Sequence, residues 1–223
     1  MTNKKILIAT GGTGGHIFPA YSLANHLKKK NYQLKITIDK RGLKYFKNLN
    51  NLDLIQIPAS PFNKKNIFKF LFSLLTIAYS IMISLFYLIL NRPSIIFGTG
   101  GYSSFPICIA ASILRIKFVI YESNLIIGKT NKFLLPYAKK IFVSYKDLEG
   151  VPSKYNSKIY EVGNIVRQEI IETKFSQTKN NEFFWPMPET PYFNRSYGEY
   201  VHQIISLSDQ VSTMFKRFDD FMN

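Results

Sequence analysis

The sequence contains one cysteine and three scattered histidines. With Cys108 as the only thiol among 223 residues, an intrachain disulfide framework and a zinc site of clustered thiols are both excluded. Neither an Asp-x-Asp pair nor a His-x-x-x-His pair occurs, so we predict no metal site of recognisable type and no cofactor. The first residues lead into a strand pattern without an apolar export segment, which favours a reducing cytoplasm over secretion.

Acidic residues are also scarce. The chain has 14 Asp and Glu against 29 Lys and Arg, a formal net charge of +15. Such a balance is typical of proteins that meet nucleic acid, an anionic membrane surface or a phosphorylated substrate. No RNA- or DNA-binding motif occurs, and the basic residues follow a compositional bias along the whole chain, so we expect no nucleic-acid partner.

The stretch "KKILIATGGTGGHIFPAYSLANHL", residues 4–27, joins a strand pattern to a helix pattern. Its apolar run predicts a buried strand ending at Thr10, and the spacing from Ile17 predicts a helix from about His16, with Pro19 in its first turn. The glycines between them leave bare N–H groups at a helix N-terminus, which favours phosphate. The spacing is not G-x-G-x-x-G, and only Asp39 could hold a ribose, so a nicotinamide cofactor is not favoured.

Strand and helix patterns alternate up to about residue 165. This order predicts an α/β fold with a Rossmann-like, doubly wound parallel sheet. Ligands of such sheets bind at the carboxyl ends of the strands. Further strands are expected at 33–38, 53–57, 93–98, 117–121, 139–144 and 158–163, and helices near 41–49, 103–115 and 126–137.

Residues 67–90 form an apolar run with a single charge, Lys69. The run is long enough to span a bilayer. However, it lies between two predicted strands of one sheet, contains several Ser, Thr and Tyr, and follows the basic stretch "NKKN". We therefore expect a helix with one face on the sheet and the other on an anionic membrane surface. An ordinary buried helix and a true span are the alternatives.

The composition changes after residue 172. Residues 173–199 are polar and place three prolines within six residues, which disfavours regular structure. Apolar positions from Val201 onward follow one helical stripe. We interpret residues 1–172 as one domain, 173–199 as a linker and 200–223 as a terminal helix of unknown role.

A second glycine turn, "GTGGYSSFP" at residues 98–106, repeats the design of the first. It carries Gly100, Gly101 and Tyr102 after another strand. One such loop could be structural, but two loops at one sheet edge favour a ligand that carries a diphosphate. Later turns, "YESNLIIGKTN" and "VGNIVR", add polar side chains beyond the following strands.

Together, "GGTGGHIFPA", "GTGGYSSFP", "ESN…GKTNK" and "VGNIVR" resemble the N-terminal half of the MurG-type glycosyltransferases in order and separation. The resemblance covers about residues 4–172 and implies the first domain of a GT-B fold. It implies inverting transfer of N-acetylglucosamine from UDP-N-acetylglucosamine, without a metal, to undecaprenyl-diphosphate-linked muramoyl-pentapeptide. This reaction belongs to peptidoglycan synthesis, at the cytoplasmic face of the bacterial plasma membrane, where the enzyme is peripheral.

The resemblance also implies roles for individual residues. The glycine loops, including Gly100, Gly101 and Tyr102, would hold the lipid diphosphate. An inverting transfer needs a base for the incoming hydroxyl. His16 is the first candidate, as base or as a group that orients the hydroxyl, because a neutral imidazole accepts a proton; Glu122 is the alternative. Positions that match the family's donor contacts are Thr13, Gly14, Gly15, Asn124 and Arg167.

The sequence departs from the family in three places. Ser123 stands where the family usually has glutamine, and Ile165 stands where it has proline. Nothing from residue 173 onward resembles the donor-binding domain with its "GGSQG"-like loop, so activity would need a separate donor-domain chain. The alternatives are a non-catalytic remnant or membrane-surface module that binds lipid diphosphate, and an unrelated nucleotide-binding domain.

Overall fold

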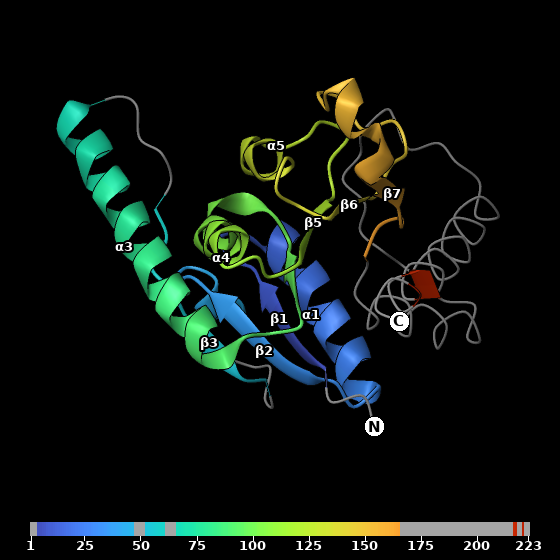
Figure 1. Ribbon diagram of the computed structural model, residues 1–223, viewed down its shortest axis with the longest axis horizontal. Helices are drawn as coiled ribbons and strands as arrows, with labels where there is room; N and C mark the ends of the chain where they lie inside the picture. Colours follow the sequence, from blue (N-terminus) through green and yellow to red (C-terminus); the bar gives the residue numbers. More distant parts are fainter. Residues whose placement is uncertain (1–3, 47–51, 61–65, 166–215, 218–219, 221–223) are drawn as a thin grey trace, which may run out of the picture.

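The computed structural model describes residues 4–46, 52–60, 66–165, 216, 217 and 220. Its centre is one sheet of seven parallel strands in the order β3-β2-β1-β4-β5-β6-β7. The predicted doubly wound parallel sheet is therefore confirmed (Figure 1). The strands are β1 (Lys5–Ala9), β2 (Gln33–Ile38), β3 (Leu54–Gln56), β4 (Ile95–Gly98), β5 (Phe118–Glu122), β6 (Lys140–Val143) and β7 (Ile159–Glu161).

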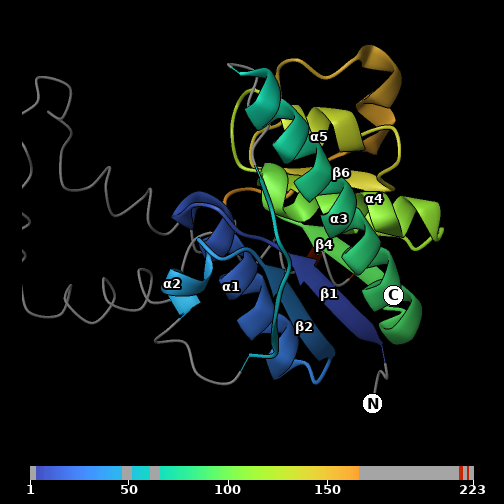
Figure 2. The same cartoon turned by 90° about the vertical axis from the view of Figure 1, so that its left-hand side faces the viewer.

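Helices cover both faces of this sheet. Figure 2 shows α1 and α2 on one side and α3 and α4 on the other. The helices are α1 (Gly14–Lys29), α2 (Leu43–Phe46), α3 (Ile67–Asn91), α4 (Gly101–Ile113) and α5 (Lys129–Leu134), and a 3₁₀ helix, η1, spans Ser153–Lys158. Each expected strand and helix up to residue 165 is present, although α2 is described only to residue 46.

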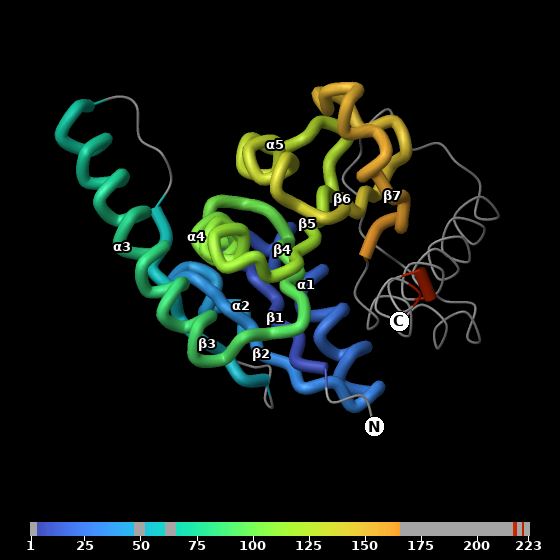
Figure 3. The backbone as a smooth tube through the Cα atoms, viewed as in Figure 1, coloured from blue at the N-terminus to red at the C-terminus, as the bar shows by residue number. Residues whose placement is uncertain are grey.

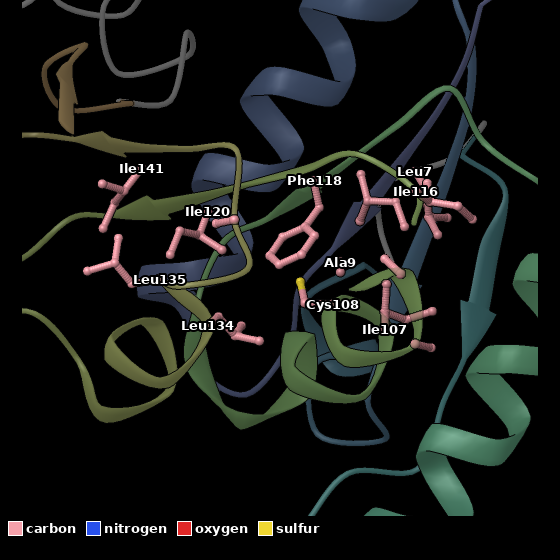
Figure 4. Packing of buried hydrophobic residues seen from close by; sticks show 14 of the residues in the cluster. Leu7, Ala9, Ile107, Cys108, Ile116, Phe118, Ile120, Leu134, Leu135 and Ile141 are labelled. Atoms are coloured by element: carbon pink, nitrogen blue, oxygen red, sulfur yellow. The ribbon is translucent and has the colours of Figure 1, made fainter. Parts of the chain in front are cut away.

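Alternate residues of β1 supply two separate cores. Ile6 and Ile8 pack with the buried face of α1, whereas Leu7 and Ala9 pack with α4 and α5. Because both faces are covered, these strands are apolar at every position rather than at every second one. Figure 4 shows the second core, in which Cys108 of α4 lies among aliphatic side chains and Phe118. Burial raises the pKa of this thiol to about 12.

Both helices that follow glycine loops begin earlier than predicted. α1 starts at Gly14 rather than near His16, because the N–H groups of His16 and Ile17 bond to the carbonyl of Thr13. Pro19 is consequently the sixth residue of α1 and not part of its first turn. α4 starts at Gly101 and likewise has a proline, Pro106, as its sixth residue.

α3 is a crossover helix between β3 and β4 at the periphery of the domain (Figure 1). Its covered face packs mainly on α4 rather than on the sheet, which corrects the predicted contact. Small side chains lie on the covered face: Ser73, Ser80 and Ser84 are buried, and each hydroxyl donates to a carbonyl four residues earlier. By length and composition α3 could cross a membrane. It is not a core helix, because only 28% of its apolar 18-residue stretch is buried.

The proposed linker at 173–199 and most of the proposed terminal helix lie outside the described residues. Arg167 also lies outside them. Of the last segment, residues 216, 217 and 220 are described, and they are helical. The Arg217 side chain donates to the carbonyl of Glu161 on β7.

Candidate functional site

The two glycine loops leave the same edge of the sheet from neighbouring strands. β1 and β4 pair in parallel, with Ala9 opposite Gly98, and Figure 3 traces the two strands next to each other. Beyond the strands, Thr99 N–H donates to the Ala9 carbonyl at 2.9 Å, and the hydroxyls of Thr99 and Thr10 are 2.8 Å apart. The predicted proximity of the loops is confirmed.

His16 joins the first loop to the second. Its Nδ1 lies 2.8 Å from the Thr99 carbonyl oxygen. Because a carbonyl only accepts, Nδ1 carries the hydrogen and Nε2 of the neutral ring is left as a hydrogen-bond acceptor. The Thr10 hydroxyl donates to the His16 carbonyl at 2.9 Å. The imidazole is therefore held in the tautomer that can accept a proton.

Two glycines of the second loop allow the imidazole to approach. A Cβ on Gly101 would lie 3.2 Å from His16 Nε2, and one on Gly100 would lie 3.4 Å from Cε1. Both glycines have positive φ, +88° for Gly100 and +70° for Gly101, where other residues are strained. These glycines thus leave room for the His16 ring and also adopt the backbone conformation of the turn.

The helix N-termini at this edge present positive partial charge. The Thr13 side chain makes no capping hydrogen bond to α1, and Gly100 offers α4 no side chain at all. The first turns of both helices lack acidic residues. Two helix dipoles therefore point their positive ends at one region, and neither first turn carries an acidic side chain to neutralise them.

Glu122, the alternative base, is buried and fully engaged. Its Oε1 accepts from the backbone N–H and side-chain amide of Asn124, at 3.1 and 2.7 Å. Its Oε2 accepts from Gly128 N–H at 2.8 Å and from the Asn131 amide at 3.0 Å. Because four donors occupy the two carboxylate oxygens, the geometry favours a role in shaping the 123–131 turn over a role as base.

Two residues that the sequence reasoning left out of the site also lie here. Asn131 is buried, donates to the Tyr121 carbonyl at 2.9 Å and approaches Gly100; its presence inside the "GKTNK" motif was the available signal. Asp39 was considered only as a ribose ligand. Its Oδ1 instead accepts from the N–H groups of Gly12 and Gly42, at 2.8 and 2.9 Å, so it braces the first loop.

The departure at Ile165 has a local explanation. The Ile165 N–H donates to the Tyr121 hydroxyl at 3.1 Å, a bond that proline could not make. The Tyr121 hydroxyl also lies 2.7 Å from Ser144 Oγ. Burial is the main cause that raises the pKa of Tyr121, so the phenol stays neutral and available to the segment after β7.

The parallel sheet and the paired glycine loops define a Rossmann-like N-terminal domain of the GT-B glycosyltransferase type. The profile of the glycosyltransferase family 28 N-terminal domain matches residues 6–143. The chain belongs to this family.

Two curated relatives share the name UDP-N-acetylglucosamine--N-acetylmuramyl-(pentapeptide) pyrophosphoryl-undecaprenol N-acetylglucosamine transferase. The relative from Rickettsia felis is 41% identical over 179 residues, which are 80% of this chain and 48% of the relative. The one from Pelagibacter ubique is 36% identical over 74% of this chain and 46% of its own length. The chain thus spans about half the length of the curated relatives it matches.

Solved structures show the same architecture. The crystal structure of Acinetobacter baumannii MurG superposes with a TM-score of 0.59 at 25% identity, over 71% of this chain and 45% of that one. A UDP-GlcNAc 2-epimerase from Neisseria meningitidis superposes with a TM-score of 0.55 at 16% identity, over 79% of this chain and 50% of that chain. The second likeness concerns the fold alone.

We predict that Gly101→Ala destabilises the domain by about 1–2 kcal/mol, because it places a Cβ at positive φ against His16. Gly15→Ala is the matched control. Gly15 is helical and its Cβ would meet only Thr13 Oγ1, at 3.9 Å, so this change should leave stability equal or raise it by up to about 1 kcal/mol. Urea unfolding measures both, and equal stability of the two variants would contradict the packing described.

We predict that Glu122→Gln destabilises the domain by about 1–3 kcal/mol, because the new amide NH₂ would face N–H donors in place of one carboxylate oxygen. Glu149→Gln, at an exposed position, should change stability by less than about 0.5 kcal/mol. Thermal unfolding compares the two. A Glu122→Gln variant as stable as wild type would reopen the assignment of Glu122 as a catalytic base.

Proposed function

We propose that this chain is the acceptor-binding half of a peptidoglycan N-acetylglucosaminyltransferase. Its reaction transfers N-acetylglucosamine from UDP-N-acetylglucosamine to undecaprenyl-diphosphate-linked muramoyl-pentapeptide, the step from lipid I to lipid II. The observation that carries the proposal is His16, held between two glycine loops with Nδ1 bonded to Thr99. The curated names of the relatives support the choice of substrates.

In this proposal, His16 Nε2 accepts the proton of the attacking muramoyl hydroxyl. The hydrogen bond from Nδ1 to the Thr99 carbonyl persists when the ring becomes cationic and then stabilises that charge. The oxygen that has lost its proton attacks the anomeric carbon as UDP leaves on the opposite side, so the configuration inverts. At the end of the step the proton is on His16, the sugar is on the acceptor, and UDP has left with the electron pair of the broken bond.

The remaining predicted residues have binding roles. The N–H groups around Thr13, Gly14 and Gly15 and the second loop at Gly100, Gly101 and Tyr102 provide the positive ends of α1 and α4 for phosphate groups. Asn124, oriented by Glu122, offers its side chain to the substrate. Arg167 keeps its proposed donor contact, although it lies outside the described residues.

Transfer in this proposal also needs a donor-binding half, which a separate chain can supply. Holding both substrates at near-attack distance provides effective molarities of about 10⁵ M or more. The described residues form one Rossmann-like sheet with one pair of glycine loops, which supplies half of that arrangement. If a donor half were added and acceptor binding but no transfer followed, the chain would instead be a non-catalytic module that binds lipid diphosphate.

We also propose that α3 rests on the cytoplasmic face of the plasma membrane. Its side away from α4 exposes large apolar side chains along its length, among them Phe68 (78% exposed), Phe72 (71%) and Leu75 (69%). Apolar burial combined with basic residues such as Lys69 is the pattern of peripheral helices on anionic lipid. The other two lysines of that pattern, Lys64 and Lys65, lie outside the described residues.

We predict that the 223-residue chain alone transfers little N-acetylglucosamine to a lipid-linked acceptor, and that adding a donor domain as a second chain raises the rate. In the mixture, His16→Ala should lower turnover about 10²- to 10⁴-fold, the usual contribution of a general base. His26→Gln, at the far end of α1, is the control. Radiolabelled sugar transfer is the measurement.

Two results would contradict this prediction. Robust turnover by the chain alone would show that a separate donor half is not needed. Turnover of the mixture that survives His16→Ala unchanged would remove His16 from the proposed base role.

We predict that the chain sediments with phosphatidylglycerol vesicles and that high salt or alkaline carbonate releases at least part of it. Replacing Phe68, Phe72 and Leu75 with serine should abolish most of this binding, since the apolar contact is lost. Tyr160→Ser, a partly exposed position on β7 at the edge of the sheet, should have no effect. Complete retention in carbonate would favour a membrane span over a peripheral helix.

A further inference from the structure

A cationic side chain is held beside the first glycine loop by a neighbour in its own turn and by a ring from a distant segment. Arg41 Nε lies 3.3 Å from Asp39 Oδ2. The centre of its guanidinium lies 4.5 Å from the centroid of the Tyr102 ring. Asp39 lies in the same turn as Arg41, directly after β2, whereas Tyr102 lies in the first turn of α4, so tertiary packing supplies the second of the two contacts.

The fixed side chain keeps its terminal nitrogens available. The Arg41 side chain is 53% exposed, and within the described residues its Nη atoms have no hydrogen-bond acceptor. A Cβ on Gly12 would lie 3.3 Å from Nη2, so the guanidinium lies against the backbone of the first loop. Asp39 neutralises it only in part, because its carboxylate also accepts from Gly12 and Gly42.

Two buried hydroxyls of the second loop also lack partners among the described residues. Ser103 is 6% exposed, and its Oγ, without a hydrogen-bond partner, would lie 2.7 Å from a Cβ on Gly11. The Tyr102 hydroxyl is buried and unpartnered as well. Tyr102 therefore contacts Arg41 through the face of its ring and not through its hydroxyl.

We propose that Arg41 binds the diphosphate group of a substrate at the first glycine loop, and that Tyr102 is a positioning residue that holds the guanidinium in place by stacking. The inference rests on the proposed function, in which the loops hold a diphosphate. A planar guanidinium donates two parallel hydrogen bonds to phosphate oxygens. Stacking on Tyr102 and the bond to Asp39 already restrict the Arg41 side chain, so binding a diphosphate costs less conformational entropy.

The test is calorimetric binding of inorganic pyrophosphate, farnesyl diphosphate and UDP to the full 223-residue chain. Arg41→Met should weaken the binding of diphosphate about ten- to hundredfold. Arg41→Lys should weaken it less, because lysine keeps the positive charge but cannot donate two parallel hydrogen bonds. Lys154→Met is the matched control: Lys154 Nζ lies 5.0 Å over the Tyr155 ring, another exposed cation on a tyrosine, and its loss should change nothing.

Variants of Tyr102 separate ring stacking from contact by the hydroxyl. Tyr102→Phe should bind as wild type does, whereas Tyr102→Ala should weaken binding toward the level of Arg41→Met. The double variant of Arg41→Met and Tyr102→Ala should be no weaker than Arg41→Met alone, because the ring acts through the cation. Additive losses, or a loss with Tyr102→Phe, would overturn the positioning role.

The three probes identify the source of the diphosphate. Tighter binding of farnesyl diphosphate supports the lipid-linked acceptor as the ligand of Arg41, and tighter binding of UDP supports the donor. If wild type binds and Arg41→Met binds equally well, this inference fails while the proposed function stands. If wild-type protein binds none of the three probes, the diphosphate site of the proposed function fails and the inference fails with it.

Discussion

The parallel pairing of β1 with β4 is the constraint on which the site depends. These strands are far apart in sequence, yet Ala9 lies opposite Gly98, so each glycine loop begins beside the other. The hydrogen bonds of Thr99 to Ala9, Thr10 and His16 then tie the loops together. Without this pairing each loop would be an isolated helix N-terminus, whereas together they place two positive helix ends and one imidazole in one region.

The contrast between His16 and Glu122 shows how environment assigns chemical roles. Both were candidate bases at the same sheet edge, where His16 follows β1 and Glu122 is the last residue of β5. The two carboxylate oxygens of Glu122 accept four hydrogen bonds, from Asn124, Gly128 and Asn131, and so hold the turn together. The His16 Nδ1 is bonded to Thr99, and Nε2 makes no hydrogen bond within the part of the chain that the structure describes. A base needs an unoccupied lone pair, which supports the proposal of His16 over Glu122 for that role.

α3 shows what hydropathy alone leaves undecided. The sequence allowed a membrane span, a buried helix or a helix at a membrane surface, because length and apolar content are alike in all three. Its place between β3 and β4 and its contact with α4 make it part of the domain. Most of its apolar surface is still uncovered, which a soluble core helix would not tolerate.

The strand and helix order, the parallel sheet and the glycine loops with His16 could be predicted from the sequence, because hydrophobic periodicity and glycine spacing are local properties. The sequence did not determine the start of α1 at Gly14, where hydrogen bonds to Thr13 set the boundary. Nor did it predict that Glu122 would be consumed by backbone donors or that Arg41 would be stacked on Tyr102. Those contacts join residues two to sixty-one positions apart, and for the distant ones only the packing of the strands and loops in three dimensions decides which polar groups meet.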